Sequence, residues 1–551
     1  MIGVAVRPSE REIATEFFEL FKTPWEFYNP GKQYDVIIST LPDLDDNTAR
    51  LIVVFAGNPI DWQGNIGVKS LTGHFIASDE GKRLPIYGSL VTFPGITQFL
   101  LQEETNQRPV AFAKRHGTTT VLRVGYNLFS EVNFLLTTGQ PAVNAGIPTL
   151  DEHISYLRDW ITRAGIPLVE IPPVPHSYNF ISCLTHDIDH PALRNHLCDH
   201  TMFGFVYRAL VGAFLDCCRG RRSLKDLGKN WHAAWQLPFV HLGIAPDRWA
   251  EFDRYLQMEE GHGATFFVIP RKNYPGRMNV GLAPKRRACR YDLDQVLPKL
   301  RRIISTGREV GVHGLDAWLD VGSGRKESES LSKRLGTTDH GVRMHWLFFD
   351  ENSPAVLDQA GFGYDSTIGF RETIGYRAGT MQVYKPLGVK ELMELPLHIM
   401  DTALFYPSYL NLTENEAQPL VRSLMNNAER IGGVLTINWH DRSIAPERLW
   451  GGFYLNLVYE LKRRNAWLPN AARAVAWFRK RRAAVLNWTW SGTDSIRVQA
   501  QLNTADTLPG LRIRVFKPRA QSLPESISAR KPLSFVENSF DRKALVDFRI
   551  S

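Results

Sequence analysis

The chain has few cysteines for its length. Among 551 residues there are five, at positions 183, 198, 217, 218 and 289, and none forms a Cys-x-x-Cys pair. An odd number without paired spacing does not suggest a disulfide framework. We therefore expect the protein to reside in a reducing compartment.

The chain also lacks the hydrophobic segments of exported and membrane proteins. Its first twelve residues contain no cationic stretch followed by a long apolar core, so we expect no secretory signal there. The longest apolar run, around residues 203–215, is interrupted by Arg208 and followed by Asp216. We therefore predict no transmembrane segment and a cytoplasmic location.

The excess of basic residues is modest and lacks the pattern of a nucleic-acid-binding protein. Lys and Arg number 65 and Asp and Glu 57, which gives a net charge of +8. This excess suits a phosphate-bearing substrate or an anionic membrane surface, although solvated basic faces also account for it. The basic clusters at residues 219–222, 285–287 and 479–482 lack the aromatic and glycine pattern of RNA-binding strands, so no nucleic acid partner is expected.

The length exceeds that of one ordinary core, which predicts two or three domains. Residues 1–165 alternate strand-like segments (34–40, 51–56 and 85–93) with helical ones (127–136 and 151–164), as in an α/β module of unknown role. Prolines at 167, 172, 173 and 175 mark the next boundary.

A second region runs from residue 170 to 485. It contains an insertion at about 195–258 that is rich in Trp, Phe, His and Arg and is expected to be helical. In residues 486–551, apolar and polar positions alternate around 496–502 and 511–516, which predicts a small β appendage.

The segment 180–190 carries the most informative motif. A β-type run leads into Thr-His-Asp-Ile-Asp-His, which places Asp187 and Asp189 on alternate residues. Alternate residues of a strand point to the same side, so both carboxylates are expected to face one site. Two close carboxylates repel each other, and a divalent cation relieves the repulsion. One can then bind metal while the other acts as a base.

Three later segments, at residues 263–270, 308–318 and 433–441, also change from apolar to polar along their length. The last two carry His313 and His440. Polar residues at the carboxyl ends of buried strands are what a barrel of β/α units requires.

Together these segments resemble the NodB-type polysaccharide deacetylases, family 4 of the carbohydrate esterases. The first matching pieces, in the family's order, are the Asp-x-Asp motif at 185–189, Ala-Thr-Phe-Phe-Val at 264–268 and a strand that ends in a histidine at 307–313. The arginine motif at Arg343 comes next, followed by Ala-Gly-Phe-Gly-Tyr-Asp-Ser-Thr at 360–367 and Glu-Leu-Pro at 394–396. The last piece is a second strand that ends in a histidine, at 435–440. The resemblance implies an irregular (β/α) barrel, flanked by the N-terminal α/β module and the small C-terminal β appendage.

The resemblance also implies roles for individual residues. Asp187 matches the general base, and Asp189 and His313 match metal ligands. Arg343 matches an arginine that orients the base by a bidentate contact. His440 matches the acid that protonates the leaving amine, and Asp401 is a candidate to orient it.

The chain departs from the family at one ligand. The family's second histidine lies four residues after the first, where this chain has Ala317. Asp316 and His345 are the candidates for the missing ligand, and we favour Asp316 slightly because a helical turn would place it on the same face as His313. His186 and His190 come next.

Three further residues are candidate substrate contacts: Arg377 in a second arginine loop, and Trp439 and Asp441 beside His440. A carboxylate next to His440 would also raise the pKa of that histidine.

We expect a deacetylase that uses a divalent metal ion, for which zinc is the leading candidate, and hydrolyses the N-acyl group, most simply N-acetyl, of an amino sugar. The substrate is an N-acylated carbohydrate that is free or phosphate-linked. A deformylase or amidase acting on another small molecule is one alternative. A non-catalytic sugar-binding relative is another, although retention of the whole residue set argues against it.

Overall fold

The computed structural model describes residues 1–41, 49–56, 69–71, 73–79, 81–338, 340–502, 506–519, 523 and 533–550. The chain forms two compact units. The first comprises Met1–Ser177, Tyr376–Leu387 and Trp477–Ser551, and the second comprises Tyr178–Gly375 and Gly388–Ala476.

The first unit contains the predicted α/β module. Its nine-stranded sheet has the order β2-β1-β3-β4-β11-β10-β9-β6-β7, with parallel pairing from β2 to β11 and antiparallel pairing beyond. The strands are β1 (Ile2–Ala5), β2 (Trp25–Phe27), β3 (Val36–Ser39), β4 (Leu51–Phe55), β6 (Phe75–Asp79), β7 (Lys82–Ile86), β9 (Leu101–Glu103), β10 (Pro109–His116) and β11 (Thr119–Val124). The helices are α1 (Arg11–Phe21), α2 (Leu128–Thr137) and α3 (Thr149–Arg163). The expected strand at 85–93 is divided, because β7 ends at Ile86 and β8 (Leu90–Thr92) pairs with β5 (Lys69–Leu71).

The C-terminal strands belong to this first unit and do not form a separate appendage. β22 (Val485–Trp490), β23 (Ser495–Gln501) and β26 (Lys543–Arg549) form one antiparallel sheet. β24 (Leu511–Phe516) pairs with both β25 (Phe535–Phe540) and β12 (Leu168–Glu170). In addition, the buried Arg481 donates to the backbone carbonyls of Leu20 and Ile171. The predicted boundary at residue 485 is therefore replaced by one near 477.

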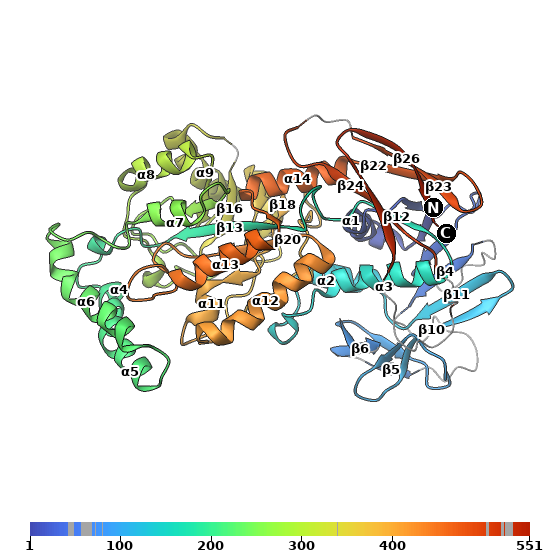
Figure 1. The fold of residues 1–551 in the computed structure, drawn as a ribbon, viewed down its shortest axis with the longest axis horizontal. Coiled ribbons are helices and arrows are strands. Elements are labelled where there is room, and N and C mark those ends of the chain that lie inside the picture. Colours follow the sequence, from blue (N-terminus) through green and yellow to red (C-terminus); the bar gives the residue numbers. More distant parts are fainter. Residues whose placement is uncertain are drawn as a thin grey trace. The chain divides into compact units, whose positions relative to one another are not determined.

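The second unit is built on a parallel sheet. Its order is β18-β17-β16-β15-β14-β13-β20-β19, with β21 also paired to β13. The strands are β13 (Phe180–Ile188), β14 (Thr265–Val268), β15 (Glu309–Gly314), β16 (Gly341–Met344), β17 (Tyr364–Asp365), β18 (Met393–Glu394), β19 (Ile399–Met400), β20 (Val434–Asn438) and β21 (Ala466–Trp467). Figure 1 shows helices flanking this sheet: α7 (Phe252–Met258), α8 (Leu293–Ser305), α9 (Val321–Leu335), α11 (Asp401–Phe405), α12 (Glu414–Ile431) and α13 (Gly451–Arg463). A further helix, α10 (Ser353–Ala360), lies between β16 and β17 in the chain.

The order of the strands shows that this sheet is curled. β18 and β19 are the two edge strands, yet only residues 395–398 separate them in the chain. Such a connection spans at most about 18 Å when fully extended, so the two edges must approach each other. Among the described residues no ladder joins β18 to β19, and the sheet is a parallel half-barrel.

The insertion after β13 is helical, as predicted. It contains α4 (His200–Tyr207), a π-helical turn (Arg208–Gly212), α5 (Ala213–Cys218) and α6 (Leu224–His241), drawn in green in Figure 1. By length and composition, His200–Cys218 is able to cross a membrane, and it is the one helix of the described chain with that property. Arg208 interrupts the apolar run of this stretch, on which the prediction of no transmembrane segment rests, but only 22% of the stretch is buried inside the protein.

Candidate active site

The candidate site lies where the parallel strands of the second unit end. β13 is flanked by β14 and β20, and every described pair in this sheet is parallel. The carboxyl ends of the strands therefore meet at one edge. Asp187 is the penultimate residue of β13, and Asp189 follows the strand. The sequence predicted polar residues at the carboxyl ends of the buried strands, and the structure places Asp187 and Asp189 there.

Three side chains at this edge form a potential metal site. Ligand atoms of Asp189, His313 and His345 all lie within 4.8 Å of one another. Asp189 Oδ1 is 3.4 Å from His313 Nε2 and 3.3 Å from His345 Nδ1, and those two nitrogens are 2.9 Å apart. β13, β15 and β16 thus each contribute one donor, from the strand or just beyond it.

The chemical state of these donors suits a metal ion. His313 Nδ1 lies 2.9 Å from the carbonyl oxygen of Arg343, which can only accept, so Nδ1 carries the proton and Nε2 keeps the lone pair that a metal ligand needs. Burial lowers the pKa of His345 to about 4, which keeps its ring neutral. Burial alone would raise the pKa of Asp189, but His345 and His313 hold it well below its usual range.

An orphaned oxygen supports the same interpretation. Asp189 Oδ1 is buried and has no hydrogen-bond partner, although it lies beside two imidazole nitrogens. A buried carboxylate oxygen without a partner carries a desolvation cost that a cation would remove. The three residues therefore fit a divalent ion, and one carboxylate with two histidines is a donor set of the catalytic zinc type.

Asp316, the favoured third ligand, is placed elsewhere. Its Oδ2 accepts from Tyr274 Oη at 2.6 Å and Arg277 Nε at 3.2 Å, and its Oδ1 accepts from the backbone of Arg277 at 2.7 Å. The reason is local: residues 315–319 form bends and turns rather than the helical turn that would have aligned Asp316 with His313. His345 takes the position instead.

The two reserve candidates are also engaged elsewhere. His186 has its Nδ1 2.8 Å from the Trp439 carbonyl oxygen and its Nε2 2.8 Å from Glu259 Oε1. His190 Nδ1 lies 3.1 Å from His196 Nε2. Neither histidine joins the cluster of Asp189.

Asp187 sits beside the metal cluster but has both oxygens occupied. Its Oδ1 accepts from Arg343 Nη1 at 3.0 Å and its Oδ2 accepts from Asn438 Nδ2 at 2.7 Å. Burial would raise its pKa, but His313, Arg343 and His440 outweigh burial and lower it. The carboxylate is therefore ionised and fixed in orientation, which are the properties of a general base.

Arg343 is held by several groups at once. Its Nη1 also donates to Thr185 Oγ1 at 2.8 Å, its Nε donates to the Ser366 carbonyl at 3.0 Å, and its Nη2 donates to Ser366 Oγ at 2.9 Å. Only one nitrogen reaches Asp187, so the expected bidentate contact is replaced by a single hydrogen bond. The Tyr-Asp-Ser-Thr motif serves this arginine, because Ser366 accepts twice from it.

His440 is paired with Asp401, as the sequence suggested. Its Nδ1 lies 2.6 Å from Asp401 Oδ1, and its backbone N–H donates to Asp401 Oδ2 at 2.7 Å. The other ring nitrogen, Nε2, is 3.9 Å from Asp189 Oδ2 and so faces the cluster. Burial opposes protonation, but Asp401 and then Asp189 and Asp187 raise the pKa of His440 to about 10. The ring is thus a positioned cation.

Two of the predicted substrate contacts, Trp439 and Asp441, are buried in the second unit, and the backbone N–H of Asp441 donates to the Asp187 carbonyl at 3.2 Å. Trp439 is fully buried, because it points away from His440 on the alternate side of the chain and packs on Phe453 and Tyr454. Asp441 accepts from the backbone of His190 and of Arg442, each at 2.8 Å, and burial raises its pKa to about 7.

Arg377 belongs to the first unit, where its carbonyl accepts from the backbone of Gln140 at 2.8 Å. Sequence reasoning missed Asn438, although its place at the end of a strand, two residues before His440, was a usable signal.

No family model and no curated protein matches this chain. Solved structures do resemble it. A protein from Mycobacterium smegmatis named as a polysaccharide deacetylase is 19% identical, with a match that covers 56% of this chain and 95% of its own and a TM-score of 0.36. One from Pseudomonas aeruginosa with the same designation is 15% identical. That match covers 41% of this chain and 72% of its own, with a TM-score of 0.30.

A family 4 acetyl xylan esterase from Clostridium thermocellum, solved in complex with a cobalt ion, is 16% identical. The match covers 42% of this chain and 87% of the esterase, with a TM-score of 0.23. Several structural neighbours are therefore polysaccharide deacetylases or members of carbohydrate esterase family 4, the family that the sequence motifs resemble.

Proposed function

We propose that the second unit is a metal-dependent hydrolase that removes an N-acyl group, most simply N-acetyl, from an amino sugar. The observation that carries this proposal is the convergence of three elements at one strand edge. They are a potential metal site, an ionised carboxylate with both oxygens fixed, and a histidine held protonated by a buried aspartate. Metal-dependent hydrolysis of an amide uses these three functions together.

Asp189, His313 and His345 would hold the divalent ion. When bound, such an ion lowers the pKa of a water and polarises the acyl carbonyl. A sugar that carries the acyl amine, either free or phosphate-linked, is the proposed substrate.

Asp187 accepts the proton of the attacking water in this proposal. The hydrogen bonds from Arg343 and Asn438 keep its carboxylate ionised and aimed. His440 then donates a proton to the amine nitrogen as the bond between carbon and nitrogen breaks. Asp401 keeps that ring protonated and oriented, with Nε2 directed at the cluster.

All five cysteines are free. This supports a reducing compartment, and we keep a cytoplasmic location as part of the proposal.

The function is tested by metal content and acyl release. Purified protein is expected to carry close to one divalent ion per chain by inductively coupled plasma mass spectrometry, because one donor set is present. Release of acetate or formate from a panel of N-acylated sugars, free and phosphate-linked, should stop on chelation and return with added zinc. Full hydrolysis by metal-stripped protein would refute the mechanism. If the purified protein binds sugars but neither binds metal nor releases the acyl group, it is a non-catalytic relative.

His440→Ala is expected to lower kcat by about 10²–10⁴-fold, the usual contribution of a general acid or base. The imidazolium is the active form, so the wild-type rate should fall as pH rises through the pKa of His440 in the complex. This alkaline limb should vanish in His440→Ala. In Asp401→Asn it should shift to lower pH, because the charge that raises the pKa of His440 is gone. The measurement is kcat against pH, and an unchanged limb in both variants would exclude the role.

A further inference from the structure

Exposed apolar side chains are concentrated in one short part of the molecule. Of the 25 large hydrophobic residues that are exposed in the described chain, 13 lie between Leu197 and Ile244. A soluble surface normally scatters such residues singly, whereas a contiguous group marks an interaction site. The catalytic proposal uses none of these side chains.

The first insertion helices carry an apolar stripe on their outer side. Phe203, Tyr207, Leu210 and Phe214 are between 40% and 59% exposed, and their spacing of four, three and four residues places them on one helical face. The opposite side of the same helices is buried, at Phe205, Ala209 and Ala213. This stretch is therefore apolar on both sides, with one side facing the protein and the other facing solvent.

The longer helix α6 repeats the pattern. Leu224, Trp231, Trp235 and Phe239 lie on one face and are exposed, with Trp235 at 65%. The turn that follows adds Leu242 and Ile244 at 71% and 74%. Indole rings prefer the boundary between water and lipid, because one edge is polar and the rest is apolar.

Basic residues accompany these stripes. Residues 199–244 contain six Arg and Lys and three Asp, a net charge of +3. Arg219, Arg221 and Lys225 lie in and just after the turn between α5 and α6, and all three are exposed. The segment is thus cationic as well as apolar, which complements an anionic lipid surface.

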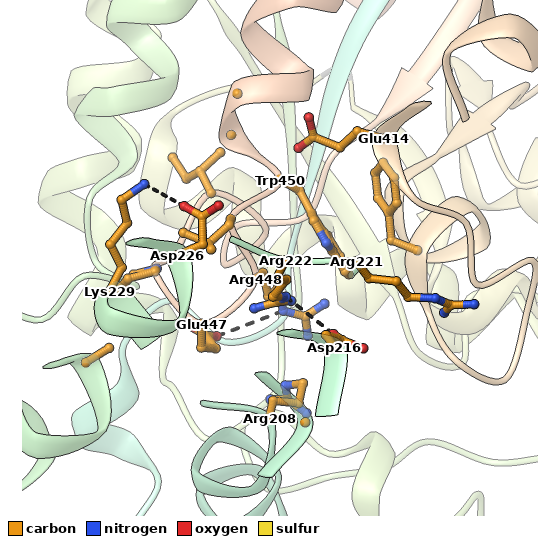
Figure 2. Close-up of a pocket in the computed structure, with 18 of the residues that line it drawn as sticks. Arg208, Asp216, Arg221, Arg222, Asp226, Lys229, Glu414, Glu447, Arg448 and Trp450 are labelled. Carbon is orange, nitrogen blue, oxygen red and sulfur yellow. Dashed lines mark hydrogen bonds and ion pairs between the residues drawn. The ribbon is translucent and has the colours of Figure 1, made fainter. Parts of the chain in front are cut away.

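The insertion also lines a cavity of about 1620 Å³ together with the loop that follows His440. Figure 2 shows Arg208 and Arg222 from the insertion in this cavity with Arg448 from the loop. Arg222 is paired with Asp216 at 3.3 Å, but Nε and Nη2 of Arg208 are buried without a hydrogen-bond partner. Eight basic and six acidic side chains line this cavity, so it keeps a small excess of positive charge behind the exposed turn.

The contacts of the helix His200–Cys218 also distinguish a helix that lies on a membrane surface from one that crosses the membrane. The inner face of the helix His200–Cys218 packs on the protein through Phe205, which contacts Trp249 in a buried cluster. Arg208, at the middle of the helix, points into the cavity rather than outward. A helix held to its domain along one side can place its outer face in the headgroup region, but it cannot be surrounded by lipid.

We propose that residues 197–244 dock onto the surface of an anionic lipid bilayer. The outer stripes of α4–α5 and of α6 enter the headgroup region, and the basic turn between them contacts lipid phosphates. This inference is independent of the proposed catalytic function, because it rests on residues outside that site.

The test is cosedimentation of the full chain with vesicles. One set is phosphatidylcholine alone, and the other contains phosphatidylglycerol as well. Wild-type protein is expected to bind the anionic vesicles and to lose much of that binding at high salt. Trp231→Ser/Trp235→Ser should weaken binding at least about tenfold, since two apolar anchors are lost. Arg219→Gln/Arg221→Gln should weaken it roughly 10–30-fold on anionic vesicles only, at about 1 kcal/mol per charge.

Trp490→Ser is the matched control, because Trp490 is 45% exposed and Trp231 is 47% exposed, but Trp490 lies on β22 in the other unit. It should bind like wild type, and circular dichroism and metal content should be unchanged in all variants. No vesicle binding by wild type, or equal binding by the Trp231→Ser/Trp235→Ser variant, would overturn the proposal. If light scattering instead shows a dimer that this double variant dissociates, with no lipid binding, the occupant is a second copy of the chain and the proposal fails.

Discussion

Replacing His345 with alanine is expected to abolish metal binding and hydrolysis together. The cluster has three donors, and catalytic zinc sites keep three protein ligands with one open position. Two remaining donors, Asp189 and His313, would hold an ion only weakly. The purified variant should therefore contain little metal after dialysis and should show no acyl release above background. Metal content and turnover are measured on the same sample.

Asp316→Asn is the control for this prediction. The sequence slightly favoured Asp316 over His345 as the third ligand, but its oxygens already accept hydrogen bonds from Tyr274 and Arg277. This variant should keep close to one ion per chain. The weakened hydrogen bonds of residue 316 should lower the thermal stability of the protein and leave its metal content unchanged. If Asp316→Asn loses metal and His345→Ala keeps it, the ligand assignment from the geometry is wrong.

The contrast between these two residues shows what the sequence could predict. Asp187 and Asp189 follow from strand periodicity, because a residue's place in a strand determines the side it faces. His313 follows from the resemblance to the deacetylase motifs. The third ligand depends on the path of the chain after β15. Residues 315–319 turn away, and His345 arrives from the neighbouring strand instead. Such a juxtaposition of separate segments is not encoded in local spacing.

The burial of Trp439, a predicted substrate contact, has a related reason. Proximity in sequence to His440 suggested Trp439 and Asp441, but adjacent residues in an extended chain face opposite sides. Trp439 is therefore in the core, while Asn438 shares the side of His440 and reaches Asp187. Alternation at the end of β20 therefore favours Asn438 over Trp439 as the residue that faces the site.

The fold was predicted in outline. In the N-terminal α/β module, the predicted strands at 34–40 and 51–56 and the predicted helices at 127–136 and 151–164 correspond to β3, β4, α2 and α3, because their hydrophobic patterns are local properties. The assignment of the C-terminal strands was not accessible in this way. β24 pairs with β12 across more than 300 residues of chain, and alternation along a strand gives its exposed and buried faces but not its partner.

Asp187→Asn is expected to separate catalysis from metal binding. The substitution removes the proton acceptor, so kcat should fall by about 10²–10⁴-fold while metal content stays close to one ion per chain. Both oxygens of Asp187 now accept hydrogen bonds, and an asparagine would present its NH₂ group to a donor, either Arg343 or Asn438. Some local rearrangement is therefore expected, and the structure of the variant should be checked by its thermal unfolding.

Asn438→Ala provides the milder test of the same base. It keeps the carboxylate of Asp187 but removes the hydrogen bond to Oδ2, which should raise the pKa of that carboxylate. The base works when ionised, so the rate falls as pH drops through its pKa, and the acid limb of the kcat profile should move to higher pH. At alkaline pH the variant should recover much of the wild-type rate, whereas Asp187→Asn should stay inactive at every pH. Near-normal turnover in Asp187→Asn would exclude Asp187 as the base. Loss of metal in that variant, to the extent seen in His345→Ala, would instead identify Asp187 as a ligand.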